Sequence, residues 1–254
     1  MVERGLVGTR ELAARTVLAG GVLVDGTLVD KPAKLVACNA LIEVHKPAPF
    51  VSRSGDKLSA ALDGFGIDPL NRICLDVGCS TGGFTDCLLQ RQAKRVYAID
   101  VGYGLIDWKL RQDPRVILFE RTNIRYAAQE LIPEFIDLAV VDVSFISLTL
   151  VLPAILKFLH DQALVVALVK PQFEVGKGRV GAGGIVRDEA QRQAVTRQVV
   201  EFAGRLGLES RGIMDSPVKG RKGNREVLAW FEYHAAQGPG TKGCEVSHRE
   251  GEES

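Results

Sequence analysis

Two charged residues directly follow apolar runs in the second half of the chain. Asp142 comes after the run 138–141, and Lys170 comes after the run 164–169. A charged side chain beside a buried strand costs free energy unless it is paired or used in chemistry. If the two runs are neighbouring parallel strands, both residues lie at the same rim of the sheet. Taken alone, the two residues favour a structural ion pair over a proton-transfer site.

A glycine-rich loop lies earlier in the chain. The stretch from Asp76 to Phe84 reads D-V-G-C-S-T-G-G-F, so it leaves an apolar run and enters a helical pattern. Glycines allow the backbone to approach a ligand closely, and ligands in parallel sheets bind at the carboxyl ends of the strands. The acid before the first glycine would repel a pyrophosphate, but it suits the cationic end of S-adenosylmethionine. Asp100 ends the next strand and can accept hydrogen bonds from both ribose hydroxyls. The alternative is a strand–turn–helix loop that binds nothing.

Two further charged residues lie in recognisable motifs. Lys57 is part of S-R-S-G-D-K-L, at the start of a helix, and Glu226 is part of G-N-R-E, at the start of the last strand. The motifs D-V-G-C-S-T-G-G-F-T, D-V-G-Y-G, D-W-K-L-R, D-V-S-F-I-S-L and L-V-K-P-Q-F-E lie between them, in order, over about residues 50–235. In these motifs the chain resembles the TlyA family of rRNA 2′-O-methyltransferases, historically labelled haemolysins, whose catalytic domain is FtsJ-like.

The resemblance implies the reaction and the residues that carry it. FtsJ-like enzymes use a Lys-Asp-Lys-Glu tetrad, which by motif falls on Lys57, Asp142, Lys170 and Glu226. It also implies S-adenosylmethionine as the methyl donor and a ribose 2′-hydroxyl of ribosomal RNA, that of cytidine, as the acceptor. The expected cofactor contacts are Asp76, Gly78, Ser80, Thr81, Gly82, Gly83, Phe84, Asp100, Val101, Asn123 and Asp142.

The tetrad suits this chemistry. A ribose hydroxyl is a poor nucleophile until its proton is removed, whereas a sulfonium methyl group is already activated, so catalysis is positioning plus a base. An amine near other cations and away from water gives up its proton more easily, and we assign the base to Lys170. Lys57 and Asp142 would orient Lys170 and the hydroxyl, and Glu226 would hold Lys57 or the ribose.

Strand and helix patterns alternate over residues 50–235. Strand patterns cover residues 72–77, 95–100, 116–120, 138–142, 164–169 and 227–233, and helical patterns cover 84–91, 150–159 and 189–206. Continuous apolar runs that alternate with helices predict an α/β fold with a mostly parallel, doubly wound sheet. We therefore expect a Rossmann-like sheet of the type found in S-adenosylmethionine-dependent methyltransferases.

The first 46 residues form a smaller α+β zone. Thr9 can cap a helix that runs to about residue 19, and Asp25-Gly26 predicts a hairpin. Residues 35–36 and 41–44 have the pattern of two more short strands. R-G-L-V-x-T-R and the V-D-G hairpin resemble the S-four-type (alpha-L) RNA-binding module, with a first helix shorter than is usual in the family. We expect residues 47–49 to be a linker and residues 236–254 to be a disordered tail.

Several cations are expected to contact RNA. In the first zone these are Arg10, Arg15 and Lys34, and near Glu226 they are Lys219, Arg221, Lys222 and Arg225. The second group has no carboxylate within it and can bind phosphates beside the active site. A glycine-rich loop that can close over substrate is bordered by Lys177, Arg179 and Arg187. A solvated charged surface is the alternative for each group.

The composition limits the remaining possibilities. The chain has 254 residues with 46% hydrophobic residues and a net charge of +1, so any basic surface must be local. Its five cysteines contain no C-x-x-C pair, and we expect neither disulfides nor a metal. We find no signal peptide or membrane span, and expect a cytoplasmic protein without a membrane partner.

Three competing functions remain. The first is a membrane-active haemolysin, and the second is a non-catalytic RNA-binding or ribosome-assembly protein that has kept the fold. A nicotinamide dehydrogenase is a distant third, because the glycine loop departs from G-x-G-x-x-G.

Overall fold

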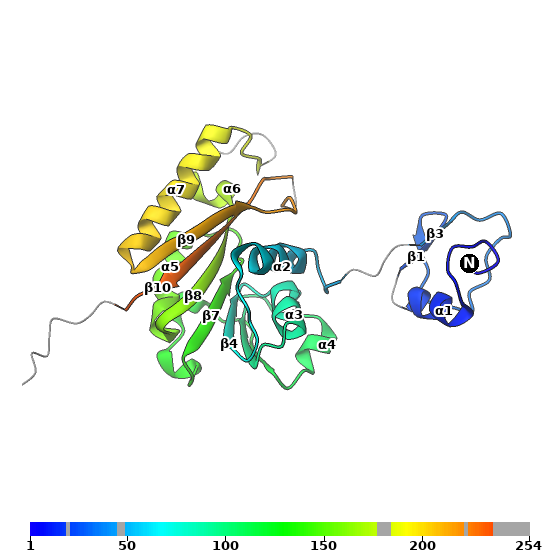
Figure 1. The fold of residues 1–254 in the computed structure, drawn as a ribbon, viewed down its shortest axis with the longest axis horizontal. Helices are drawn as coiled ribbons and strands as arrows, with labels where there is room; N and C mark the ends of the chain where they lie inside the picture. Colours follow the sequence, from blue (N-terminus) through cyan, green and yellow to red (C-terminus); the bar gives the residue numbers. More distant parts are fainter. Residues whose placement is uncertain (19–20, 45–48, 177–183, 221–222, 236–254) are drawn as a thin grey trace, which may run out of the picture.

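The computed structural model of the chain describes residues 1–18, 21–44, 49–176, 184–220 and 223–235. These residues form two separate sheets, each with its own helices (Figure 1). Residues 47 and 48 of the expected linker and the whole expected tail lie outside the described residues.

The larger sheet has seven strands in the order β6-β5-β4-β7-β8-β10-β9. Strands β4 to β8 are parallel to one another, and β10 runs antiparallel to both of its neighbours, β8 and β9. The prediction of a mostly parallel, doubly wound sheet is confirmed. The strands are β4 (Ile73–Val77), β5 (Arg95–Ile99), β6 (Val116–Phe119), β7 (Ile136–Val141), β8 (Leu159–Val169), β9 (Leu208–Asp215) and β10 (Val227–Tyr233).

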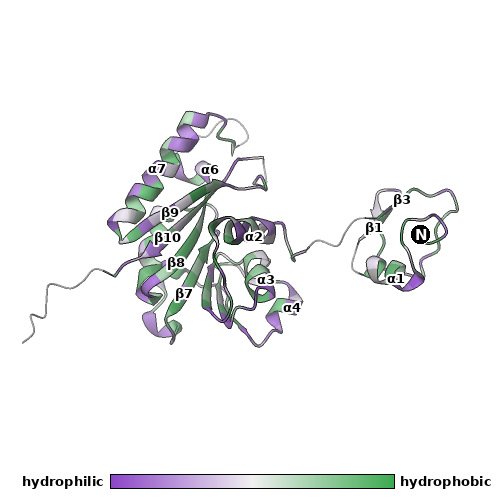
Figure 2. Ribbon diagram, viewed as in Figure 1, coloured by the Kyte–Doolittle hydropathy of each residue, from purple (hydrophilic) through white to green (hydrophobic). Residues whose placement is uncertain are grey.

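Helices cover both faces of this sheet. Residues of β7 alternate between two apolar clusters: Leu138 and Val140 pack with α2 (Ser54–Phe65) and α3 (Gly83–Gln90), and Ala139 and Val141 pack with α5 (Leu148–Ile155) and α7 (Glu189–Arg205). This alternation is the period of two that a strand buried on both faces requires. The central strands β7 and β8 are accordingly hydrophobic along most of their length (Figure 2). Shorter elements are α4 (Trp108–Arg111), α6 (Pro171–Glu174), η1 (Ile124–Tyr126), η2 (Gln129–Leu131) and η3 (Leu156–Phe158).

Two predictions about the larger sheet need correction. The helix expected at 150–159 starts and ends earlier, at Leu148 and Ile155, and Leu159 already begins β8. Strand β9 was not predicted at all. It lies at the edge of the sheet, and most of its residues after Leu208 are exposed or half-buried, so no apolar run marks it.

The smaller sheet has the order β2-β1-β3 and is packed by α1 (Arg10–Leu18). The hydroxyl of Thr9 accepts a hydrogen bond from the backbone N–H of Leu12 at 3.1 Å, which confirms the predicted cap. Strands β1 (Val22–Val24) and β2 (Thr27–Leu28) form the predicted hairpin, with positive φ at both turn residues, and β3 is Ile42–Val44. The strand expected at 35–36 is wrong: Leu35 is 96% exposed and pairs with no strand.

Across the described parts of the chain, we find no helix with the length and apolar character needed to cross a bilayer.

Candidate active site

The glycine-rich loop lies where the strand order of the large sheet reverses. β4 is flanked by β5 on one side and β7 on the other, and Val77 is opposite Val141. The loop after β4 therefore meets the loop after β7, and Asp142 N donates to Val77 O at 3.0 Å. Gly78 has φ +85°, and a Cβ at this position would lie 2.6 Å from the carbonyl oxygen of Asp142. Only glycine fits at this position, where the loop after β4 passes close to the loop after β7.

Asp100 holds the glycine-rich loop from the neighbouring strand. One carboxylate oxygen accepts a hydrogen bond from Ser80 N at 2.8 Å, and the other accepts one from Gly102 N at 2.7 Å. The first bond accompanies the left-handed backbone of Ser80, φ 48°, which is a strained conformation for a serine. Each carboxylate oxygen keeps a second lone pair, so Asp100 can still accept the ribose hydroxyls predicted from the sequence.

Asp76 lies behind the loop. Its side chain has no exposed surface, one oxygen accepts a hydrogen bond from Thr85 Oγ1 at 2.6 Å, and the other oxygen has no partner among the described residues. Burial, with a smaller contribution from the nearby charges of Asp142 and Asp100, raises the pKa of Asp76 to about 7. Asp76 therefore lies behind the loop, with no exposed surface through which a ligand could touch it.

A small cavity of about 160 Å³ opens beside this loop. Its walls include five of the residues predicted to hold the cofactor: Gly78, Ser80, Thr81, Phe84 and Asp142. Gly82 and Gly83 form the start of α3, and a Cβ on Gly83 would clash with the hydroxyl of Ser54. Val101 is 69% exposed beyond the end of β5, and Asn123 caps η1 by accepting a hydrogen bond from Arg125 N.

The residues present fit S-adenosylmethionine. The loop is a glycine cradle that added Cβ atoms would fill, and three carboxylates, those of Asp76, Asp100 and Asp142, lie close enough to influence one another. Three acids favour a cationic ligand over a pyrophosphate. Among the described residues, no cluster of histidine, cysteine or carboxylate side chains could hold a metal ion.

Lys170 and Asp142 meet at the rim of the sheet, as predicted. Lys170 Nζ lies 2.6 Å from Asp142 Oδ1 and donates a hydrogen bond to Ser144 Oγ at 2.8 Å. The Lys170 and Asp142 side chains are 11% and 15% exposed. The contact follows from the sheet, because β7 and β8 are parallel neighbours and both residues leave the carboxyl ends of their strands.

Lys57 and Glu226 form a second buried ion pair. Their side chains are 10% and 3% exposed, although the two residues are 169 positions apart in the sequence. Glu226 reaches this rim because β10 is antiparallel, so that Val227, at its start, is opposite Val169, at the end of β8. The structure thus brings the predicted tetrad together as two ion pairs on one rim.

The tetrad lies between the small cavity and a larger one of about 710 Å³. Lys57, Lys170 and Glu226 line the larger cavity, Asp142 lines the smaller one, and Lys170 lines both. A volume of this size is within the usual range for a site that takes a small molecule or one unit of a polymer. Two ligands that enter from the two cavities would meet at Lys170.

Aromatic side chains form one wall of the larger cavity. The Phe145 and Phe173 rings have centroids 5.0 Å apart, tilted by 48°. Phe145 is 91% exposed and has φ 64°, which is unfavourable for a bulky residue. An exposed aromatic ring held in a strained backbone beside charged groups is typical of a binding site.

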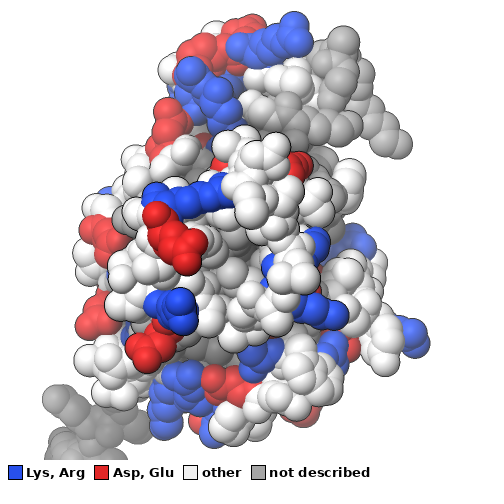
Figure 3. All heavy atoms as spheres, turned by 90° about the vertical axis from the view of Figure 1, so that its right-hand side faces the viewer, with Lys and Arg blue, Asp and Glu red and all other residues white. Residues whose placement is uncertain are grey.

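The cations predicted to bind RNA fall in different places. Lys219 lines the larger cavity, whereas Arg225 lies 3.9 Å from Glu189 and lines a separate hollow with Arg187. Arg221, Lys222, Lys177, Arg179 and the side chain of Arg15 lie outside the described residues. Basic and acidic side chains are interspersed on the face shown in Figure 3, in keeping with the net charge.

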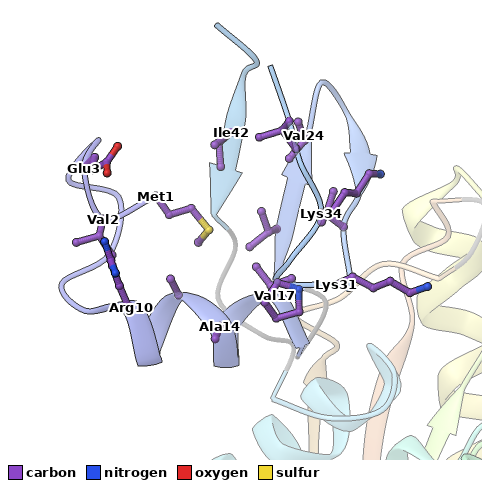
Figure 4. Close-up of a pocket in the computed structure, with 15 residues that line it drawn as sticks. Met1, Val2, Glu3, Arg10, Ala14, Val17, Val24, Lys31, Lys34 and Ile42 are labelled. Carbon is purple, nitrogen blue, oxygen red and sulfur yellow. The ribbon is translucent and has the colours of Figure 1, made fainter. Parts of the chain in front are cut away.

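Arg10 and Lys34 line a groove of about 490 Å³ in the smaller unit. Its floor is apolar and includes Val17, Val24 and Ile42, and the two cations lie at opposite sides (Figure 4). Lys31, which the sequence analysis did not single out, lies on the same side as Lys34.

Sequence reasoning missed several polar residues of the larger site. Ser144 contacts Lys170, and Ser52, Ser54 and Arg53 line the larger cavity. All three belong to the S-R-S-G-D-K-L motif, whose position at the start of α2 is a signal that could have included them. Ser144 lies in the D-V-S-F-I-S-L motif, two residues after Asp142, and this position is the signal that could have included it.

Comparisons with known proteins agree with this site. Residues 50–233 match the model of the family described as FtsJ-like methyltransferase. The chain is 45% identical over 247 residues to the 16S/23S rRNA (cytidine-2′-O)-methyltransferase TlyA of Mycobacterium tuberculosis, covering 96% of this chain and 92% of the relative. It is 42% identical to Hemolysin A of Brachyspira hyodysenteriae, covering 90% and 96%. A solved Streptococcus thermophilus structure classed with the hemolysins is 44% identical, with a TM-score of 0.73 over 91% of this chain and 86% of that one.

Proposed function

The chain belongs to the FtsJ-like methyltransferase family, and from this we propose that it methylates a ribose 2′-hydroxyl of ribosomal RNA, at cytidine, with S-adenosylmethionine as the methyl donor. One observation carries the proposal: Lys57, Asp142, Lys170 and Glu226, from four separate segments, meet where the glycine-rich loop adjoins a larger cavity. Since the substrate is ribosomal RNA, we place the enzyme in the cytoplasm.

The residues of the two cavities divide the work. Gly78, Ser80 and Thr81 would hold the cofactor beside Asp142, and Asp76 would favour its positive charge from behind. When bound, S-adenosylmethionine supplies a methyl group on a sulfonium sulfur, which keeps the electron pair of the broken carbon–sulfur bond while the ribose oxygen forms the new bond to carbon.

Lys170 would act as the base. In its neutral form it takes the proton of the ribose hydroxyl, and Asp142 stabilises the ammonium that results. Lys57, held by Glu226, places a second positive charge on the wall of the larger cavity, where the hydroxyl loses its proton. Water is displaced from the larger cavity as the nucleotide enters, which strengthens these interactions.

The first 44 residues would bind the RNA away from the catalytic rim. We propose that Arg10, Lys31 and Lys34, around the groove of the smaller unit, contact phosphates. Lys219 and Arg53 would contact the RNA beside the active site. We therefore propose two domains: residues 1–46 form an RNA-binding module, and residues 50–235 form the catalytic domain.

The test is the variant Lys170→Ala. Its loss of the base should abolish methyl transfer to ribosomal subunits, while the affinity for S-adenosylmethionine, measured by calorimetry, remains. The control is Lys94→Ala, which removes an exposed lysine away from the tetrad. Undiminished turnover of Lys170→Ala would refute the role of Lys170. A wild-type protein that binds S-adenosylmethionine and RNA but leaves no 2′-O-methyl group in the rRNA would instead be a non-catalytic RNA-binding protein.

A further inference from the structure

Ser144 contacts the amine to which we assign the base. Its Oγ accepts a hydrogen bond from Lys170 Nζ at 2.8 Å. Asp142, two residues earlier in the chain, has its Oδ1 2.6 Å from the same nitrogen. We propose that Ser144 is a positioning residue which, together with Asp142, fixes the direction in which Lys170 presents its lone pair. The proposal rests on the proposed function, because it gives a role to Ser144 only if Lys170 takes the proton.

The argument is one of directions around a single nitrogen. An amine nitrogen is tetrahedral, and one of its four directions is the bond to its own side chain. A neutral lysine has two N–H bonds and one lone pair. The hydrogen bond to Ser144 Oγ fixes one N–H direction, and the Asp142 carboxylate attracts the remaining N–H from 2.6 Å away, although its Oδ1 accepts no hydrogen bond, so few directions remain for the lone pair. Ser144 Oγ is the acceptor in this contact, so its own hydrogen can point away from the nitrogen.

The location of Lys170 beside both cavities is consistent with a lone pair that points toward the substrate hydroxyl. Lys170 and Ser144 each line both the smaller and the larger cavity, so they lie where the cofactor and the nucleotide would meet. Without Ser144, the amine can rotate about its last carbon–nitrogen bond and still keep its contact with Asp142. The lone pair would then point at the hydroxyl for only part of the time, which lowers the rate of proton removal without changing what is bound.

Ser144 has no other evident task in the fold. It is exposed, it lies in the loop between β7 and α5, and it is absent from the apolar clusters, whereas its neighbour Val143 packs against one of them. Removal of its hydroxyl therefore leaves the core intact. This separates Ser144 from Ser147, three residues later, which caps α5 and also contacts Glu174.

The experiment compares Ser144→Ala, Ser144→Thr and the matched control Ser210→Ala, which changes an exposed serine of β9. Ribosomal subunits that lack the modification are the RNA substrate, and initial rates give kcat and KM separately. We expect kcat of Ser144→Ala to fall roughly 10- to 100-fold, with KM for the subunits and Kd for S-adenosylmethionine within about twofold of wild type. Ser144→Thr keeps the oxygen and should recover kcat to within about threefold.

The outcomes are distinguishable. An unchanged kcat in Ser144→Ala overturns the inference and leaves the proposed function standing, since the wild-type protein still methylates. A loss that appears in Kd for S-adenosylmethionine or in thermal stability, or one that Ser144→Thr does not restore, also overturns it, because a lost structural contact would then explain the result. If the wild-type protein transfers no methyl group, the proposed function fails and the inference fails with it.

Discussion

The ion pair between Lys57 and Glu226 allows the stability of the site to be separated from its chemistry. The change that we consider is Glu226→Leu, which leaves the ammonium of Lys57 without its partner. Both side chains are at most 10% exposed, so water screens the lost interaction only weakly. A second variant, Lys57→Met with Glu226→Leu, removes both charges and keeps side chains of similar volume.

The size of the effect follows from this burial. Breaking a buried pair by removing one partner costs about 3–5 kcal/mol, and the lower end, about 3 kcal/mol, applies because both residues line a cavity that water can enter. For a domain of this size, each kcal/mol lowers Tm by about 2–4 °C, so Glu226→Leu should unfold about 6–12 °C below wild type. Replacing both partners by apolar residues is often neutral, so the double variant should regain most of this loss.

The assay is thermal unfolding followed by calorimetry, together with methyl transfer to ribosomal subunits. The double variant should recover Tm but not activity, because the charges that face the larger cavity are gone. The matched control is Asp63→Ala, which breaks the exposed pair with Arg91 and should cost at most about 1 kcal/mol. An unchanged Tm in Glu226→Leu would show that the pair is not buried as described. Wild-type methylation by the double variant would remove Lys57 and Glu226 from the chemistry.

Three further predictions concern the cofactor loop and the RNA. Gly78→Ala should weaken binding of S-adenosylmethionine, measured by calorimetry, and lower Tm, measured by thermal unfolding. The reason is that the new Cβ would lie 2.6 Å from the Asp142 carbonyl oxygen. Unchanged binding would contradict this close approach of the two loops. The pKa of Asp76 is raised from 3.8 to about 7 by folding, so the folded state holds a proton that unfolding releases and stability falls as pH rises through this range. Asp76→Asn should therefore raise Tm relative to wild type more at about pH 8 than at about pH 5, and an equal effect at both would refute the shift. The double variant Arg10→Ala, Lys34→Ala should weaken RNA binding and leave binding of S-adenosylmethionine unchanged. If each residue contacts one phosphate, the slope of log affinity against log salt concentration should become less steep by about two.

The sequence was most informative where local pattern and topology agree. Asp142 and Lys170 each follow an apolar run, and parallel neighbouring strands must bring the residues after them to one rim. Glu226 is different, because it precedes its strand. In a parallel strand it would have lain at the opposite rim, and only the family motif placed it correctly. The reversal of β10 that explains its position depends on pairing with β8 and β9, which no local pattern encodes.

The features that were missed depend on contacts between distant segments. β9 is an edge strand with many exposed residues, so it lacks the apolar run by which the other strands were found. The false strand at 35–36 has the opposite cause: Leu35 and Val36 favour an extended chain, but no neighbouring strand or core is present to pair with them. The sequence also does not reveal that Asp76 is fully buried: β4 lies between two strands and is covered on both faces, so all of its last four residues are buried.

The insertion of β10 between β8 and β9 has a consequence for biosynthesis. Among the described residues, β10 is the last strand in sequence order, yet it lies inside the sheet. Until residues 227–233 emerge, the apolar edge of β8 has no partner, and β9 has no strand to join. A nascent or prematurely terminated chain would therefore expose an edge that invites association with other chains. Glu226 reaches the rim through the same strand, so a chain that stops before residue 226 would lack both the closed sheet and the complete tetrad.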